Sequence, residues 1–213
     1  MFEDLKSDSS QITAAKSRPQ IIFIRHGLTD WNAEGRYQGQ IDIPLNDIGK
    51  QQARRNGYVL GEFLEHRGRS ADDYQWVASP MTRTRQTMDL VRSVLELPEG
   101  EYAQDDQLVE ITFGEWEGRT NVEIAERDPE GVAQRKADKW GFTPPGGESY
   151  ETASKRVKSW LDGVELPTIV VSHGGINRLL RGLMFSIPDT IVPEMAVPQD
   201  QFLICDQGSG MWL

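Results

Sequence analysis

Cysteine and long apolar runs are nearly absent from this sequence. Cys205 is the only cysteine among 213 residues. The chain therefore forms no internal disulfide, and nothing in its cysteine content indicates secretion. Cys205 itself lies in an apolar run and is expected to be a buried, inert thiol. No apolar stretch approaches the roughly 18 residues of a membrane-spanning helix, and residues 1–19 lack the apolar core of a signal peptide. We therefore expect a cytoplasmic protein without a membrane partner, and we interpret residues 1–19 as a flexible polar tail.

Basic residues are also scarce, and they form no run along the chain. The 23 lysines and arginines stand against 33 aspartates and glutamates, which gives a net charge of −10. This balance disfavours nucleic acid and anionic membrane surfaces as partners. The length and the 38% hydrophobic content fit one α/β domain over residues 20–213.

Three apolar runs predict buried strands, and each leads to basic side chains. Residues 21–24 run directly into Arg25 and His26, residues 75–78 precede Arg83, and residues 168–171 precede His173. Runs without polar alternation are typical of parallel strands that are covered by helices on both faces. Gly27 is expected to allow a sharp turn directly after the first strand.

The ends of these strands predict a cationic crevice. Ligands of open α/β sheets bind beyond the carboxyl ends of the strands, so two histidines and two arginines should meet there. Few ligands other than a phosphoryl group need such a pocket. A neutral imidazole is a good nucleophile near pH 7, and arginines disfavour its protonation and neutralise phosphoryl oxygens. The leaving alkoxide needs a proton, for which Glu110, Glu115 and Glu117 are the candidates.

The remaining pattern alternates helices and loops. Asn46 and Ser149 are expected to cap helices that continue to about Glu65 and Leu161, because apolar residues recur there at helical spacing. A third helix carries Arg83 in its first turn. A fourth begins at residues 174–175, where free backbone amides should bind an anion. Helical structure is expected within 120–139, loops at 31–45 and 141–147, and a last strand at 201–205 that closes the chain.

Other site chemistries fit the sequence less well. Histidine ligands of metals normally work with nearby carboxylates or thiolates, whereas each histidine here accompanies arginine, whose charge repels a cation. The sequence contains neither a Gly-x-Ser-x-Gly nucleophile elbow nor a Walker-type glycine-rich loop with lysine. We therefore expect no metal and no cofactor.

An ordered set of motifs from about residue 20 to 185 resembles the histidine phosphatase superfamily, in the branch that includes cofactor-dependent phosphoglycerate mutase. The first motif, Arg25-His26-Gly27, is weak alone, but the whole series is highly specific. The other matches are Thr29, Trp31, Asn32, Tyr37-Gln38-Gly39, Asp42, Pro44-Leu45, Ser79-Pro80, Arg83, Gln86-Thr87, Leu108, Glu110, Phe113-Gly114, Trp116-Glu117-Gly118, Pro145-Gly146-Gly147-Glu148-Ser149 and Ser172-His173-Gly174-Gly175.

The resemblance implies a role for each matching catalytic residue. His26 would become phosphorylated, and Arg25, Arg83 and His173 would hold the phosphoryl group. Glu110 matches the family's proton donor and would later activate water against the phosphohistidine.

The resemblance also implies binding residues and a fold. Asn32 and Gln38 would donate neutral hydrogen bonds, and Gly174 would add a backbone contact. The implied fold is a three-layer α/β/α sandwich with a mostly parallel sheet, elaborated over about residues 110–150.

Three functions remain to be separated. A mutase must retain a bisphosphate, and the mutases resembled here carry a longer basic insertion after the proton donor. This chain instead has a short acidic segment after Glu110, and its Gly174-Gly175 pair resembles that of the phosphatases. We therefore favour a phosphomonoesterase for a small phosphorylated metabolite over a mutase. A non-catalytic phospholigand-binding protein is the third hypothesis, but the chain retains His26 and Glu110. The sequence names no substrate and leaves open whether two copies form a homodimer.

Overall fold

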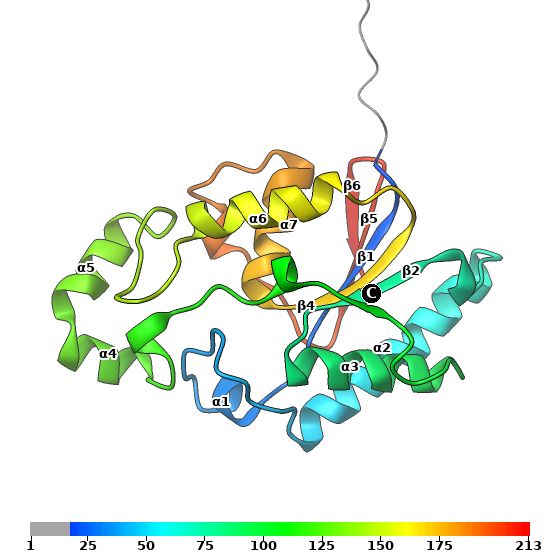
Figure 1. The fold of residues 1–213 in the computed structure, drawn as a ribbon, viewed down its shortest axis with the longest axis horizontal. Helices are drawn as coiled ribbons and strands as arrows, with labels where there is room; N and C mark the ends of the chain where they lie inside the picture. Colours follow the sequence, from blue (N-terminus) through cyan, green and yellow to red (C-terminus); the bar gives the residue numbers. More distant parts are fainter. Residues whose placement is uncertain (1–17) are drawn as a thin grey trace, which may run out of the picture.

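The computed structural model describes residues 18–213, and its centre is a six-stranded sheet in the order β3-β2-β4-β1-β5-β6 (Figure 1). Along the chain the elements are β1 (Ile21–Arg25), α1 (Asp30–Ala33), α2 (Asp47–His66), η1 (Ala71–Asp73), β2 (Gln75–Ala78), α3 (Thr82–Val94), β3 (Ala103–Gln104), η2 (Asp106–Leu108), η3 (Gly114–Trp116), α4 (Asn121–Arg127), α5 (Pro129–Ala137), α6 (Tyr150–Asp162), β4 (Thr168–Ser172), α7 (Gly174–Phe185), η4 (Val192–Glu194), β5 (Phe202–Asp206) and β6 (Ser209–Trp212).

The sheet is mostly parallel, which confirms the predicted fold class. β1, β2, β3 and β4 pair in parallel, while β5 and β6 run antiparallel at one edge. Arg25 pairs in register with Ser172, so β1 and β4 end level with each other. The residues that follow these two strands, His26 and His173, therefore emerge side by side.

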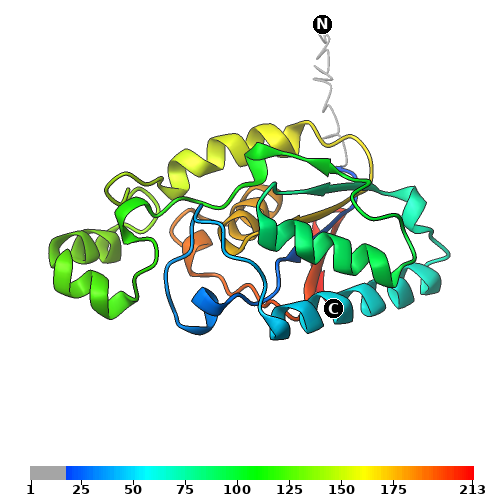
Figure 2. The same cartoon turned by 60° about the horizontal axis from the view of Figure 1, so that its bottom comes forward.

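Both faces of the sheet are covered by helices, as Figure 2 shows. In β1, Ile21 and Phe23 pack into the core beneath α6 and α7, whereas Ile22 and Ile24 pack into the core beneath α2 and α3. All four side chains are almost fully buried. β1 needs an uninterrupted apolar run because its side chains enter a hydrophobic core on each face of the sheet.

The predicted helix starts are confirmed. The Asn46 side chain accepts a hydrogen bond from the Gly49 amide at 2.9 Å, and α2 follows. The Ser149 hydroxyl accepts one from the Thr152 amide at 3.0 Å, and α6 follows. Each cap satisfies an amide that the first turn of a helix leaves without a partner. Arg83 lies in the first turn of α3, as expected.

Several short elements were missed, among them the short helices η1 to η4, and the chain does not close with the strand at 201–205. That strand is β5, and it continues through Gln207 and Gly208 into β6. Both turn residues have positive φ, of 46° and 79°, which is typical of a two-residue hairpin connection. α1 is a single turn within the predicted loop 31–45, and β3 has two exposed residues. Such short segments carry too few apolar positions to show a period.

Residues 1–17 of the predicted tail lie outside the described residues, whereas Arg18 and Pro19 are within them. Arg18 donates hydrogen bonds to the Leu161 carbonyl at 3.0 Å and to the Asp162 carboxylate at 2.9 Å, at the end of α6. Arg18, which belongs to the predicted tail, is therefore attached to the body of the protein.

The lone thiol of Cys205 lies in β5 and is 2% exposed. Burial raises the pKa of this thiol to about 12, so it stays protonated at neutral pH and is a poor nucleophile. The expectation of a buried, inert cysteine is confirmed.

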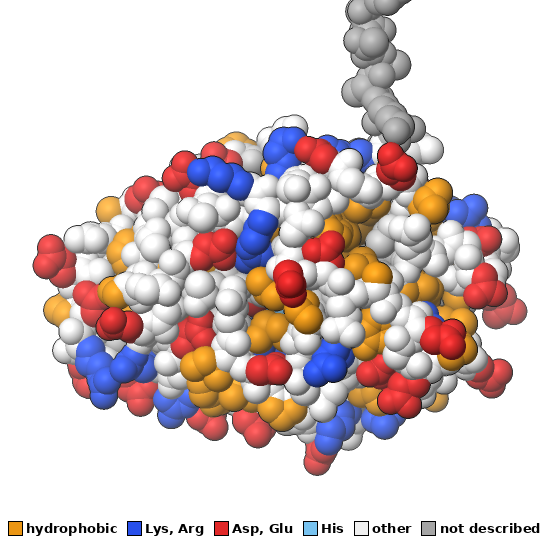
Figure 3. Space-filling model, viewed as in Figure 1, with side chains coloured by type: hydrophobic (Ala, Val, Ile, Leu, Met, Phe, Trp, Pro, Cys, Tyr) orange, Lys and Arg blue, Asp and Glu red, His pale blue; other side chains and the backbone are white. Residues whose placement is uncertain are grey.

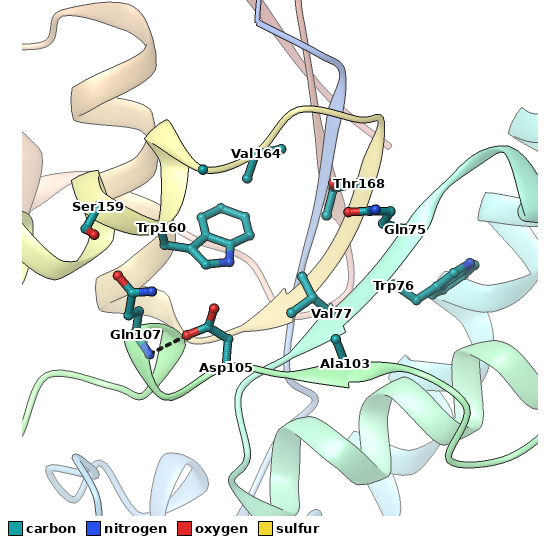
Figure 4. Close-up of a pocket in the computed structure, with 11 residues that line it drawn as sticks. Gln75, Trp76, Val77, Ala103, Asp105, Gln107, Ser159, Trp160, Val164 and Thr168 are labelled. Carbon is teal, nitrogen blue, oxygen red and sulfur yellow. Dashed lines mark hydrogen bonds between the residues drawn. The ribbon is translucent and has the colours of Figure 1, made fainter.

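One large surface hollow lies away from the cationic strand ends. Figure 3 shows apolar side chains gathered around a hollow near the middle of one face, among scattered charges of both signs. Its volume is about 500 Å³, and Figure 4 shows Trp160 of α6 and Val77 of β2 at it, with Asp105 close by. No lysine, arginine or histidine lines this hollow, so it lacks the charge that an anionic ligand needs.

No helix in the part of the chain that the structure describes has the length and apolarity to cross a membrane.

Candidate active site

His26 lies directly after β1 and is 3% exposed. Its Nδ1 atom is 2.8 Å from the carbonyl oxygen of Gly27. A carbonyl only accepts hydrogen bonds, so Nδ1 carries the proton and donates it. The lone pair of the neutral ring is consequently on Nε2, which is the atom available to attack an electrophile.

His173 follows β4, is fully buried, and has its ring centroid 5.2 Å from that of His26. The guanidinium Nε of Arg83 donates to His173 Nδ1 at 3.3 Å, so Nδ1 is the acceptor. His173 Nε2 must then donate to the Ser79 hydroxyl oxygen at 2.9 Å. Both ring nitrogens of His173 have protein partners.

Both imidazoles are neutral at pH 7. Burial, and after it the charges of Arg83 and Arg25, hold the pKa of His26 well below its ordinary value of 6.5. Burial and the Arg83 charge do the same for the pKa of His173. The expected effect of arginine on a nucleophilic histidine is therefore present, but desolvation contributes more.

Arg83 is fully buried and is held by backbone oxygens instead of carboxylates. Its guanidinium donates to the carbonyl oxygens of Gly39 at 2.7 Å and Ile41 at 3.1 Å. Arg25 donates to the carbonyl oxygen of Val197, and its buried Nε has no partner. Burial lowers the pKa of each arginine to about 10. Both groups therefore remain charged at neutral pH, and neither forms a salt bridge among residues 18–213.

Two amide side chains are oriented in the same way. The Gln38 carbonyl oxygen accepts a hydrogen bond from the Thr29 hydroxyl at 2.6 Å, and its buried amino group has no partner. The Asn32 carbonyl oxygen accepts one from Gln199 Nε2 at 3.1 Å. Because each oxygen is occupied, each amino group is left to donate to a ligand.

Glu110 is 8% exposed, and both of its carboxylate oxygens accept backbone hydrogen bonds. Oε1 accepts from the Ile111 amide at 3.0 Å, and Oε2 accepts from the Gly175 amide at 3.1 Å. The anion-binding amide expected at 174–175 is therefore engaged by Glu110 itself. A Cβ at Gly175 would lie 2.4 Å from Glu110 Oε1, so a glycine is required for the carboxylate to approach the helix.

The other two candidate acids lie in different surroundings. Glu115 is exposed. Glu117 accepts from the amides of Gln40, Ile41 and Phe113 and from the Thr112 hydroxyl, at 2.8–3.0 Å. It therefore joins two loops, and neither side chain lines the pocket described next.

A pocket of about 330 Å³ opens beside these groups. Five of the eight predicted site residues line it: Arg25, Asn32, Gln38, Glu110 and Gly174. The other three do not line it and are nearly buried: His26, Arg83 and His173. Of these three, His26 lies directly beside the pocket, because the pocket-lining Gln199 donates to the His26 carbonyl oxygen at 3.2 Å.

Comparison with known proteins agrees with this geometry. The family description "Histidine phosphatase superfamily (branch 1)" matches residues 21–212. The chain belongs to the histidine phosphatase superfamily.

Three relatives illustrate the range of this superfamily. "Bifunctional protein Rv2228c" of Mycobacterium tuberculosis is 38% identical over 79% of this chain and 45% of its own length, so the chain spans less than half of that relative. "Probable phosphoglycerate mutase GpmB" of Salmonella paratyphi C is 32% identical over 91% of this chain and 87% of its own length. A putative α-ribazole-5′-P phosphatase from Escherichia coli has a structure with a TM-score of 0.77 at 26% identity, covering 92% of this chain and 95% of that one.

Gly27, the glycine of the first motif, allows a close approach between two backbone segments. Gly27 is not among the residues with positive φ, so its backbone does not use the left-handed conformations that glycine allows. A Cβ at Gly27 would lie 2.2 Å from the carbonyl oxygen of Gly49, and a Cβ at Gly49 would meet the Leu28 backbone at 2.1 Å. The strand end and the first turn of α2 therefore touch through their backbones.

Further residues of the histidine phosphatase pocket were missed in the sequence. Gln199, Tyr150, Arg178 and Arg36 line it, together with residues already named. Gln199 lies in the loop before β5, and nothing in its neighbours along the chain indicates a site. Its role emerges only when that loop folds back beside β1.

Proposed function

We propose that the protein is a phosphomonoesterase that hydrolyses small phosphorylated metabolites through a phosphohistidine on His26, with Glu110 as proton donor. The observation that carries this proposal is the hydrogen bond from His26 Nδ1 to the Gly27 carbonyl, which leaves the Nε2 lone pair for the phosphorus atom. Arg25 and Arg83 supply positive charge for the phosphoryl oxygens.

In the first step, His26 Nε2 attacks the phosphorus atom, and the bond from phosphorus to the ester oxygen breaks. The leaving oxygen takes its proton from the protonated Glu110 carboxyl group. His173 Nδ1 accepts a hydrogen bond from Arg83, so the neutral His173 ring orients the guanidinium that holds the phosphoryl group. The amino groups of Asn32 and Gln38 donate to the phosphoryl oxygens, and Gly174 adds a backbone contact.

In the second step, the Glu110 carboxylate takes a proton from water, and the resulting nucleophile attacks the phosphohistidine. The phosphorus–nitrogen bond breaks, phosphate leaves, and His26 returns to its neutral form with Glu110 protonated. Positive charge comes from arginine throughout, so we propose that turnover needs no metal ion. We also propose that the protein acts in the cytoplasm.

Glu110 is tested by substitution with glutamine, which keeps the shape of the side chain but cannot donate the proton. An alkyl alkoxide leaves poorly without a proton, whereas p-nitrophenolate leaves well. We expect Glu110→Gln to slow phosphohistidine formation from a sugar phosphate about 10²–10⁴-fold, and much less from p-nitrophenyl phosphate. The measurement is the single-turnover burst of leaving group for each ester.

Glu115→Gln is the matched control, because Glu115 is an exposed acid of the same segment. Its burst rates should equal those of the wild type. Equal slowing of both esters in Glu110→Gln would show that Glu110 positions substrate or water and is not the acid.

A phosphoglycerate mutase is the second candidate, because a relative with that name is 32% identical over 91% of the chain. The short segment after Glu110 carries acids, Glu115 and Glu117, and no basic cluster that would retain a bisphosphate. With 3-phosphoglycerate and 2,3-bisphosphoglycerate supplied together, we expect isomerisation to be negligible beside hydrolysis of a preferred ester. Efficient isomerisation would overturn the phosphatase proposal. A non-catalytic phospholigand-binding protein would hydrolyse neither these compounds nor p-nitrophenyl phosphate.

A further inference from the structure

Arg178 is a cation of the pocket that the proposed phosphoryl chemistry does not use. It lies on α7 one turn beyond Gly174 and is half-buried. Its Nε donates to the Met195 carbonyl at 2.7 Å, and one terminal nitrogen lies 3.4 Å from the Tyr150 hydroxyl oxygen. Within residues 18–213, Arg178 has no carboxylate partner among the salt bridges.

Arg36 provides the contrast within the same pocket. Its guanidinium forms salt bridges with Glu34 at 2.6 Å and Glu123 at 3.0 Å, so its charge is neutralised by the protein. Arg178 projects an uncompensated charge into the cavity of a protein that carries a net charge of −10.

Arg178 also lies next to the proposed phosphoryl site. A Cβ added to Gly174 would lie 3.4 Å from Arg25 Nε and 3.7 Å from an Arg178 terminal nitrogen. The two guanidinium groups therefore flank the same glycine. Arg25 Nε is buried without a partner. Burial is the main cause that lowers the pKa of Arg25, the Glu110 carboxylate opposes it, and the Arg178 charge adds to it. The two cations therefore repel each other, and a ligand with two negative groups would relieve that repulsion.

We propose that Arg178 and Tyr150 form a second anion subsite that binds a carboxylate of the substrate, while Arg25 and Arg83 hold its phosphoryl group. This inference rests on the proposed phosphatase function and narrows it to phosphomonoesters that carry a carboxylate near the ester oxygen.

The geometry of Arg178 favours a carboxylate. Because Met195 occupies Nε, the edge formed by the two terminal nitrogens is what remains for a ligand. Such a planar pair of donors matches the two oxygens of a carboxylate. The Tyr150 oxygen accepts from Arg178, so its hydroxyl proton is directed to another acceptor, and Tyr150 also lines the pocket. A single uncompensated guanidinium suits a singly charged carboxylate better than a second phosphate dianion.

The test uses pairs of esters that differ only in the carboxylate: 3-phosphoglycerate with 2-hydroxyethyl phosphate, and O-phosphoserine with O-phosphoethanolamine. We expect the wild type to prefer the carboxylated member of each pair in kcat/KM. Arg178→Gln should reduce that preference about 10- to 100-fold, since a charge-assisted bidentate contact is lost. Tyr150→Phe should reduce it several-fold and provides a second variant if Arg178→Gln fails to fold.

Arg181→Gln is the matched control. Arg181 lies on the same helix, donates to the Ala196 carbonyl and stacks on Trp212, but does not line the pocket. It should retain the wild-type preference. Equal losses for both members of a pair in Arg178→Gln, or no preference in the wild type, would overturn the subsite.

Failure of the phosphatase proposal gives a different result, because p-nitrophenyl phosphate would then also resist hydrolysis. In that case calorimetric binding of 3-phosphoglycerate and 2-hydroxyethyl phosphate tests the subsite directly. Weaker binding of 3-phosphoglycerate alone in Arg178→Gln would support the subsite, and unchanged affinity for both compounds would overturn it.

Discussion

His26 and His173 follow neighbouring parallel strands and are almost equally buried, yet their rings make different hydrogen bonds. His26 has one ring partner, the Gly27 carbonyl, and its Nε2 remains free. His173 has two, Arg83 on one nitrogen and the Ser79 hydroxyl on the other. The same burial and the same arginine lower the pKa of both rings.

The difference shows that a lowered pKa does not by itself identify a nucleophile. Both imidazoles are neutral at pH 7, but only His26 has a lone pair that is not committed to a protein donor. The lone pair of His173 on Nδ1 accepts from Arg83, so His173 is a neutral ring that orients this guanidinium. The pKa values do not distinguish His26 from His173, but the hydrogen bonds at their ring nitrogens do.

The largest expected effect is loss of the nucleophile. His26→Asn should lower turnover at least about 10⁴-fold, because no other free imidazole lies in position to accept the phosphoryl group. No acid-labile, base-stable phosphoenzyme should form when the variant is mixed with a labelled phosphomonoester. The measurement is protein-bound label after a rapid quench.

His173→Gln is the comparison variant for this experiment. It should lower turnover about 10²–10³-fold through the loss of an oriented polar group, but phosphohistidine should still accumulate. If His173→Gln abolishes the phosphoenzyme while His26→Asn retains it, the assignment of the two histidines is reversed.

A smaller effect is expected in the pH dependence of stability. Both histidines are neutral when folded, whereas in the unfolded chain each takes up a proton below its ordinary pKa of 6.5. The unfolded state thus binds more protons as the pH falls below about 6.5. The free energy of unfolding should then decrease by up to about 1.4 kcal/mol per pH unit for each histidine.

Denaturant unfolding of the wild type, His26→Asn and His173→Asn at several pH values between about 7.5 and 5 measures this contribution. Each variant should lose part of the slope below pH 6.5, and the two losses should be similar because desolvation is the main cause in both. A slope equal to that of the wild type in both variants would contradict the neutral, buried state of the rings.

The meeting of the two histidines at the strand ends was predictable because it follows from local patterns. The apolar runs before Arg25 and His173 indicated buried parallel strands, and the level ends of β1 and β4 then brought the two histidines together. The helix caps at Asn46 and Ser149 were predictable for the same reason, since a cap depends on a few neighbouring residues.

Features that depend on distant contacts were not predictable. The close backbone contact of Gly27 was not predictable, because its partner Gly49 is remote in the sequence. Gln199 has no local signal, and its importance comes from the oxygens of His26 and Asn32 that it contacts. Nothing in the sequence distinguishes Arg178 from the other arginines. Only the fold shows that, within residues 18–213, it forms no salt bridge with a carboxylate. The functional roles assigned to the site residues stay predictions.

The single cysteine gives this protein an internal reporter of its own opening. Cys205 lies in β5, which pairs directly with β1, the strand that ends at Arg25 and His26. Its thiol is hidden and protonated while the sheet is intact. Cys205 pairs with Ile21, the first residue of β1. A thiol-specific reagent can therefore label the chain only when the sheet opens at the start of the strand that leads to the proposed nucleophile. The labelling rate would count those events directly, without an added probe and without substitution of any residue.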